Sequence, residues 1–314
     1  MKLLLPDSVD LSALTLPAEV TGFTYDVSAP VPEEHADADF LVVWGNPGDQ
    51  LSDAASRLGR LRWVQTLAAG PDMVVAAGFP SSVVITSGNG LHDLTVAEHA
   101  LALVLAAARE LPKLTRAQIG HRWAAESGGL QPVADPDHFR TLRDAHVVIW
   151  GFGGIAATLA PYLSMLGARV TGVARSAGER RGFPVRTPES LPTLLPTADV
   201  LINILPATST TRKIVDASVL ALLPPKAWFV NVGRGATVDE DALLTALRSG
   251  RLAGAALDVF ETEPLPASSG LWDEPNVIIT PHSAGGRPLG AADLIRSNLD
   301  ALLAGRELRN VVER

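Results

Sequence analysis

The 314-residue sequence contains no cysteine. That absence excludes disulfide scaffolds, thiol nucleophiles, iron–sulfur clusters and cysteine-based zinc sites. Long apolar runs are also missing, because the longest helical run, Ala100 to Ala108, has nine residues, whereas a membrane span needs about 20. The chain start is broken early by Pro6 and Asp7, which does not fit the apolar core of a secretory signal. We therefore expect a cytoplasmic protein without a membrane segment.

Positive charge is scarce as well. The 26 Lys and Arg residues against 34 Asp and Glu residues give a net charge of −8. Proteins that bind a phosphate backbone normally present a basic surface, so nucleic acid is not an expected partner. Apolar residues make up 47% of the chain and charged residues 19%, which is enough apolar material for buried cores. At about 150 residues per domain, the length predicts two domains.

Short apolar runs that end in Gly, Pro or Asn alternate with helical segments along most of the chain. This alternation predicts an α/β protein whose parallel sheets carry helices on both faces. The predicted strands are Phe40–Trp44, Trp63–Leu67, Val83–Thr86, His146–Trp150, Ala168–Ala174, Val200–Ile204, Trp228–Val232, Ala255–Val259 and Val277–Thr280. Residues 120–140 are rich in Gly and Pro and predict a long loop or arm, a feature that usually serves function or an interface. A final amphipathic helix, from about Gly290 to Leu303, can return to the first α/β unit.

The segment Gly151 to Ala156 (GFGGIA) matches the dinucleotide fingerprint G-x-G-x-x-G/A. It directly follows a predicted strand and opens a predicted helix, which is the context that the fingerprint requires. Gly151 suits the tight turn, Gly153 allows a pyrophosphate to approach the backbone, and Ala156 is small enough for helix–strand packing. The free N–H groups of the helix can then hold the phosphates. The alternative is a glycine-rich turn without a ligand.

The acidic residue that usually follows this fingerprint is absent. It normally ends the next strand and binds the ribose hydroxyls of NAD, but here the strand ends in Ala174, Arg175 and Ser176. An acid at this place would repel a 2′-phosphate, whereas Arg and Ser can bind one. NADP(H) is therefore favoured, and NAD(H) stays possible. Arg180 and Arg181 follow nearby in the sequence. The alternative is that these arginines are only solvated loop residues.

Three polar residues follow successive strands of the second half: Arg234, Glu263 and His282. The carboxyl ends of the strands in a doubly wound sheet open onto the ligand crevice, so these side chains can converge. A guanidinium can hold a substrate carboxylate and polarise a carbonyl, and an imidazolium can protonate the carbonyl oxygen as hydride arrives. A neighbouring carboxylate orients the imidazole. Each residue alone is more often structural, but together they predict hydride transfer to a 2-keto acid.

With these motifs, the sequence resembles the D-isomer-specific 2-hydroxyacid dehydrogenase family, which includes glyoxylate/hydroxypyruvate reductases and phosphoglycerate dehydrogenases. The stretches that carry the resemblance are Trp63–Gly70, Val96–His99, Gly151–Ala156, Leu205–Thr211, Val230–Gly235, Ala256–Pro264 and Thr280–His282. The resemblance implies two doubly wound parallel-sheet domains. One is a Rossmann cofactor domain at 94–283 with the 120–140 arm. The other is a smaller, flavodoxin-like substrate domain formed by 1–93 and 284–314.

The resemblance also implies site residues and partners. Arg234 binds the substrate, His282 is the acid/base, Glu263 is its partner, and the backbone at Ala69 and Gly70 meets the substrate carboxylate. The implied cofactor-binding residues are Gly151, Phe152, Gly153, Gly154, Ile155, Arg175, Ser176, Leu205, Pro206, Thr211, Val232, Asp258, His282 and Ala284. Family members usually pair as homodimers through the cofactor domains, partly by the arm. No metal site is expected.

Other functions of the same fold stay open at this point. Formate dehydrogenases usually carry Gln where this chain has Glu263, and phosphite dehydrogenases keep the three residues. A nucleotide-sensing binding protein would also keep them but act by docking partners. The motifs do not identify the 2-keto acid.

Overall fold

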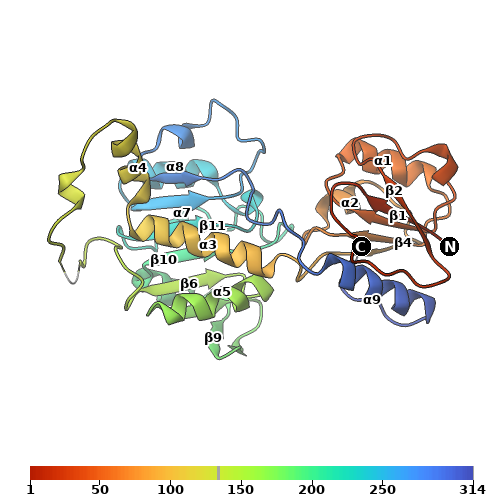
Figure 1. Cartoon of the computed structure of the whole chain (residues 1–314). Coiled ribbons are helices and arrows are strands. Elements are labelled where there is room, and N and C mark those ends of the chain that lie inside the picture. Colours follow the sequence, from red (N-terminus) through yellow and green to blue (C-terminus); the bar gives the residue numbers. More distant parts are fainter. Residues whose placement is uncertain (133–134, 314) are drawn as a thin grey trace. The chain divides into compact units, whose positions relative to one another are not determined.

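The computed structural model describes residues 1–132 and 135–313 (Figure 1). The chain divides into two compact units. The first comprises residues 1–92 together with the chain from Arg287 onward, and the second comprises Asp93–Gly286. Both are α/β units built on largely parallel sheets, so the predicted fold class is confirmed.

The first unit contains a five-stranded parallel sheet in the order β2-β1-β3-β4-β5. Its strands are β1 (Lys2–Pro6), β2 (Thr21–Tyr25), β3 (Phe40–Val43), β4 (Trp63–Thr66) and β5 (Val84–Thr86). Its helices are α1 (Gly48–Arg57), α2 (Asp72–Ala76) and α9 (Ala291–Leu303). This strand order is flavodoxin-like, with its reversal between β1 and β3.

Two apolar clusters fill the two faces of this sheet. On one face, Leu41 and Val64 pack with Leu51 of α1 and Val74 of α2. On the other face, Phe40 and Trp63 pack with Leu294, Ile295 and Leu299 of α9. The C-terminal helix therefore completes one of the two apolar clusters of the first unit, although it follows the second unit in the chain.

The second unit contains an eight-stranded sheet in the order β13-β12-β11-β10-β6-β7-β9-β8. Its strands are β6 (His146–Trp150), β7 (Arg169–Val173), β8 (Gly178–Arg180), β9 (Phe183–Arg186), β10 (Val200–Asn203), β11 (Trp228–Asn231), β12 (Gly254–Leu257) and β13 (Val277–Ile279). Its α-helices are α3 (Asp93–Ala108), α4 (Leu111–Ile119), α5 (Gly154–Met165), α6 (Leu191–Leu194), α7 (Ala217–Leu220) and α8 (Glu240–Arg248). Short 3-10 helices occur in this unit at Ala125–Ser127, Pro188–Ser190, Leu195–Thr197, Gly235–Thr237 and Gly270–Asp273, and in the first unit at Glu33–His35.

The strand order of this sheet reverses at β6, which pairs with β7 on one side and β10 on the other. Figure 1 shows α3 and α5 side by side on one face, where they share an apolar cluster with the sheet. α8 and the shorter helices cover the other face. Ligands of doubly wound sheets bind outside the carboxyl ends of the strands at such a reversal, so this edge is where a site is expected.

Two features of the second unit differ from the sequence-based expectation. The chain after β7 forms an antiparallel hairpin, β8–β9, instead of a plain loop. The apolar pattern of the sequence predicts one long helix from about Thr95 to Leu111, whereas α3 ends at Ala108 and a separate helix, α4, precedes the arm. Of the predicted arm, residues 120–132 project from the body of their unit in Figure 1, and residues 133 and 134 lie outside the described residues. Within the described chain, no helix combines the length and the apolar character needed to cross a membrane.

Candidate active site

The carboxyl edge of the second sheet carries the three predicted catalytic residues on adjacent strands. Arg234 follows β11, Glu263 follows β12 and His282 follows β13, and these strands pair with one another in that order. The structure brings Glu263 and His282 into direct contact, with His282 Nδ1 2.7 Å from Glu263 Oε2. The Arg234 guanidinium reaches the same edge and donates to the carbonyl of Gly233 at 2.8 Å.

The Glu263 carboxylate uses its two oxygens for different partners. Oε1 accepts the backbone N–H of Phe260 at 2.9 Å, and Oε2 faces His282 Nδ1. An ionised carboxylate only accepts hydrogen bonds, so Nδ1 carries a proton toward Glu263, and Nε2 is the ring nitrogen that does not face Glu263. The His282 side chain is 47% exposed, so that nitrogen can meet a substrate.

The backbone at His282 is unusual, with φ at +51°. Non-glycine residues seldom adopt this left-handed conformation, and such strain tends to occur at functional sites. The His282 N–H donates to the carbonyl of Asp258 at 2.8 Å. The loop that carries the imidazole is therefore fixed through its main chain as well as through Glu263.

Asp258 lies buried beneath this loop, with 1% of its surface exposed. Its carboxylate accepts the Thr280 hydroxyl at 2.6 Å, the Ser283 N–H at 2.9 Å and the Ala284 N–H at 3.1 Å. Burial by itself raises the pKa of the Asp258 carboxyl, but hydrogen bonds from His99, Thr280 and the two backbone groups lower it to about 2. The sequence indicated Asp258 only as a cofactor contact, and the structure shows that it also holds the loop of His282.

The glycine loop after β6 has the shape that a dinucleotide requires. Gly151 has φ at +103°, and a Cβ there would lie 2.7 Å from the backbone of Ile204, so only glycine fits. At Gly153, by contrast, no described atom lies within 4 Å of an added Cβ. Gly153 is the N-cap of α5 and has no side chain to cap it, so the first N–H groups of that helix can meet an anion. The loop therefore leaves room for a pyrophosphate at Gly153.

The structure adds Arg180 to the residues predicted to lie near the adenosine ribose of the cofactor. Arg180, at the end of β8, donates to the carbonyl of Phe152 in the glycine loop and to Ser176 Oγ at 3.0 Å. Arg175 and Ser176 are exposed beside it. The sequence shows Arg180 and Arg181 near Arg175, but it does not assign Arg180 to the cofactor, because the β8–β9 hairpin that places it was not predicted. Gly178 begins β8 and Gly182 lies in the turn before β9; both have positive φ, and these two glycines were the available signal.

The other predicted cofactor residues lie along the same edge. Leu205 and Pro206 follow β10, where the Thr211 hydroxyl donates to the Pro206 carbonyl at 2.6 Å. Val232 follows β11, and its N–H donates to the carbonyl of Asn203 at 3.1 Å. Phe152 is buried against the sheet, and Ile155 packs on the same apolar cluster at the start of α5.

The predicted substrate residues Ala69 and Gly70 belong to the first unit. They follow β4 at the carboxyl edge of that sheet. The neighbouring Ala68 is fixed on both sides, because its N–H donates to Thr66 Oγ1 and its carbonyl accepts the Gly88 N–H at 2.7 Å. The loop therefore has a defined backbone.

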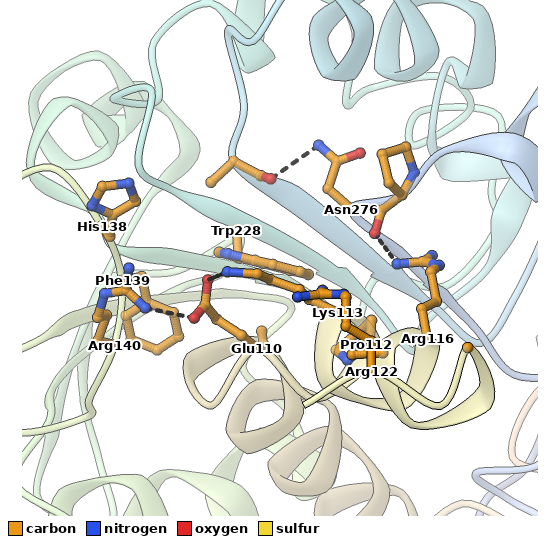
Figure 2. Close-up of a pocket in the computed structure, with 15 residues that line it drawn as sticks. Glu110, Pro112, Lys113, Arg116, Arg122, His138, Phe139, Arg140, Trp228 and Asn276 are labelled. Carbon is orange, nitrogen blue, oxygen red and sulfur yellow. Dashed lines mark hydrogen bonds and ion pairs between the residues drawn. The ribbon is translucent and has the colours of Figure 1, made fainter. Parts of the chain in front are cut away.

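A cavity of about 690 Å³ lies at the opposite edge of the second sheet (Figure 2). Trp228, which begins β11, and Phe139 form its apolar part, and Lys113 and Arg116 of α4 border it. Arg116 donates to the carbonyl of Pro275. Because Trp228 begins β11 and Arg234 follows the other end of that strand, this cavity is separate from the candidate active site.

Across residues 1–132 and 135–313, no group of three or more His, Asp or Glu side chains could hold a metal ion.

Comparisons with known proteins identify one family to which the chain is similar. The family model "D-isomer specific 2-hydroxyacid dehydrogenase, NAD binding domain" matches residues 101–284. The chain is 33% identical over 299 residues to glyoxylate/hydroxypyruvate reductase A of Serratia proteamaculans, covering 91% of this chain and 90% of that protein. Among solved structures, a D-isomer specific 2-hydroxyacid dehydrogenase from Xanthobacter autotrophicus in complex with NADPH has a TM-score of 0.81 at 32% identity, covering 100% of this chain and 98% of that chain. An NADPH-dependent glyoxylate/hydroxypyruvate reductase from Sinorhizobium meliloti in complex with NADP has a TM-score of 0.81 at 26% identity, covering 99% and 98%.

Proposed function

Since the chain belongs to the D-isomer specific 2-hydroxyacid dehydrogenase family, we propose that it reduces a small 2-keto acid of the glyoxylate or hydroxypyruvate type to the D-2-hydroxy acid. It is an NAD(P)-dependent oxidoreductase, and NADP(H) is the favoured cofactor. The observation that carries the proposal is the His282–Glu263 pair, 2.7 Å apart, in the same unit as a glycine loop that fits a pyrophosphate.

We assign the proton and the substrate to specific side chains. The nicotinamide cofactor supplies the hydride to the carbonyl carbon when it is bound. His282 Nε2 donates the proton to the carbonyl oxygen, and Glu263 holds the opposite nitrogen so that Nε2 faces the substrate. Arg234 binds the substrate carboxylate with its planar fork and polarises the carbonyl. The products are the 2-hydroxy acid and the oxidised cofactor, and the reverse reaction uses neutral His282 as the base.

The cofactor is assigned to the carboxyl edge of the second sheet. Gly151, Gly153 and Gly154 with the start of α5 are proposed to hold the pyrophosphate. Arg175, Ser176 and Arg180 supply donors for a 2′-phosphate, and Ala174 stands where a carboxylate would repel it. The proposed nicotinamide end comprises Leu205, Pro206, Thr211, Val232, Asp258 and Ala284.

The second unit is the proposed cofactor domain, and the first unit is the proposed substrate domain. In the first unit, the backbone at Ala69 and Gly70 is assigned to the substrate carboxylate. Two broader features complete the proposal. The protein acts in the cytoplasm, where reduced pyridine nucleotides are available, and it forms a homodimer. The dimer is supported by large apolar side chains that the second unit leaves exposed near α4, such as Ile119 at 73% and Trp123 at 92% exposure.

A substrate panel tests the activity. Purified protein is mixed with NADPH or NADH and with glyoxylate, hydroxypyruvate, pyruvate and phenylpyruvate, and the loss of absorbance at the reduced nicotinamide band is followed. We expect turnover of at least one small acid, faster with NADPH, and D-stereochemistry in the product. Binding of NADPH without turnover of any 2-keto acid would favour a nucleotide sensor. Oxidation of formate or phosphite with NADP would reassign the chemistry.

A further inference from the structure

His99 is part of a hydrogen-bonded group that the proposed chemistry does not use. It lies on α3, and its Nε2 is 3.0 Å from Thr280 Oγ1 and 3.3 Å from Asp258 Oδ1. In the sequence it belongs to the stretch Val96–His99, to which no role is assigned. The two residues that it meets follow strands β13 and β12, more than 150 positions further along the chain.

The protonation of the His99 ring follows from its partners. The Thr280 hydroxyl has one hydrogen, which it donates to Asp258 Oδ1 at 2.6 Å. Its oxygen is therefore an acceptor toward His99, and the ionised Asp258 carboxylate is an acceptor as well. Nε2 must then carry a hydrogen, shared between the two oxygens. His99 is a donor from α3 to a buried carboxylate.

The other hydrogen bonds of Asp258 lead to the loop of the proposed acid/base. Its carboxylate accepts N–H groups from Ser283 and Ala284, and its own carbonyl accepts the N–H of His282. His282 is held in the left-handed region, so its loop needs outside support. Through Asp258 and Thr280, His99 connects that loop to α3, which is anchored in the core of the unit by side chains such as Ala100 and Val104.

We propose that His99 is a positioning residue for hydride transfer, because its Nε2–H holds Thr280 and Asp258 and thereby fixes the loop that aims His282 at the substrate. The inference rests on the proposed function in so far as it concerns the acid/base role of His282. Without His99, the Asp258 carboxylate keeps its donors from Thr280, Ser283 and Ala284, so the unit folds. The loop loses its connection to α3, however, and a misplacement of about 1 Å at a reacting group can cost about a hundredfold in rate.

The test compares three variants of the full chain. His99→Leu removes the donor at similar size, and His99→Gln keeps an N–H donor. Leu101→Ala is the matched control, because Leu101 lies on the same helix and packs on the core cluster instead of facing Asp258. For each, we measure kcat, KM for the 2-keto acid, Kd for NADPH, the thermal midpoint, and the primary isotope effect with NADPH deuterated at C4 of the nicotinamide.

His99→Leu should lower kcat about ten- to a hundredfold and raise the isotope effect, since a misplaced proton donor makes chemistry more rate-limiting. Its Kd for NADPH should stay within about threefold, and His99→Gln should recover most of kcat. Leu101→Ala should lower the thermal midpoint without changing the isotope effect. If His99→Leu behaves like Leu101→Ala, His99 is only structural and the proposal is overturned.

A second measurement does not depend on turnover. Hydrogen–deuterium exchange of the segment 282–284 reports the N–H groups that bind Asp258. We expect faster exchange in His99→Leu than in wild type, and wild-type exchange in Leu101→Ala. Unchanged exchange in His99→Leu would overturn the positioning role. An inactive wild type with the expected exchange pattern would instead count against the proposed function alone.

Discussion

The carboxylate of Glu263 joins two partners that both donate, the Phe260 N–H and the His282 ring. Glu263→Gln keeps the size but turns one oxygen into an NH₂ group, which must face one of these donors. The ring should lose its orientation, and kcat for reduction should fall about ten- to a hundredfold, the loss expected for one charge-assisted hydrogen bond. Steady-state kinetics with NADPH check this result, and KM for NADPH should change little.

The control is Glu261→Gln on the same loop. The Glu261 carboxylate pairs with Arg212 at 3.6 Å and Lys213 at 3.3 Å and does not belong to the proposed acid/base pair. Exposed pairs of this kind contribute little, so kcat should stay near that of wild type. Equal losses in the two variants would mean that the effect of Glu263→Gln is a general disturbance of the loop.

Arg234 is proposed to recognise a planar carboxylate, a task for which lysine is a poor substitute. Arg234→Lys keeps the charge but loses the two-pronged donor. We expect a higher KM for the 2-keto acid and a lower kcat, with an unchanged thermal midpoint and unchanged NADPH affinity. Arg248→Lys is the matched change at a remote guanidinium that pairs with Glu274. Near-normal kcat/KM in Arg234→Lys would remove Arg234 from the site.

The position of Arg180 leads to a separate prediction about the preference for NADPH over NADH. Its contacts to Phe152 and Ser176 place its guanidinium where the glycine loop and the turn after β7 meet. Arg175→Ala and Arg180→Ala should each weaken NADPH binding about ten- to a hundredfold and weaken NADH binding much less. Arg181→Ala, at the next and exposed position, is the control. Fluorescence titration with both cofactors decides, and equal losses for NADPH and NADH would contradict a role in phosphate recognition.

A buried histidine at the start of strand β6 makes the stability of the fold depend on pH. His146 begins this strand and is buried, with Nδ1 3.0 Å from Thr197 Oγ1 and Nε2 3.1 Å from Thr171 Oγ1. Burial and the charge of Arg169 lower the pKa of the imidazole in the folded protein. The unfolded chain takes up a proton near pH 6.5 and the folded chain only at lower pH, so stability falls as the pH drops below about 6.5.

His146→Gln removes this titration and can keep both hydrogen bonds. Between pH 7.5 and 5.5, the thermal midpoint of wild type should therefore fall more than that of the variant. His121→Gln makes the same change at an exposed histidine and should follow the wild-type curve. Parallel curves for wild type and His146→Gln would show that His146 is protonated equally in the folded and unfolded chains.

The elements that could be predicted are those with strong apolar runs bounded by turn residues. The predicted strands 40–44, 63–67 and 83–86 correspond to β3, β4 and β5, and the strands from 146 onward correspond to β6, β7 and β10 to β13. The strands β1 and β2 were both missed. In β2, Thr21–Tyr25 lie at the edge of the sheet and only Tyr25 is buried. In β1, Lys2–Pro6 carries an apolar run, but it stands at the chain start and was considered only as the core of a secretory signal. The hairpin β8–β9 was missed because its short strands lack an apolar pattern.

Part of the candidate site could also be predicted from the sequence, because its residues follow the predicted strands. Residues that directly follow strands share one edge of the sheet, so Arg234, Glu263 and His282 could be proposed together. The role of Asp258 under the loop and the approach of His99 from α3 could not, because they depend on packing between elements far apart in the chain. The local sequence pattern does not indicate which side chains of α3 will contact the loops after β12 and β13. Those contacts form only when α3 packs on the sheet.

At the scale of the whole molecule, exposed apolar side chains predict self-association. Leu111 and Ile119 of α4, and Trp123 and Leu130 of the following segment, are all exposed. The helix α4 also contributes Lys113 and Arg116 to the lining of the cavity formed by Trp228 and Phe139. A monomer seldom leaves such a group of apolar side chains exposed, and a two-fold interface would let each chain bury the exposed group of the other.

Trp123→Glu should therefore shift the protein from dimer to monomer, as measured by light scattering coupled to size-exclusion chromatography. Trp272→Glu, at a 51% exposed tryptophan elsewhere in the same unit, should leave the mass unchanged. A wild-type mass of one chain at micromolar concentration would refute the dimer, and a dimeric Trp123→Glu would place the interface elsewhere.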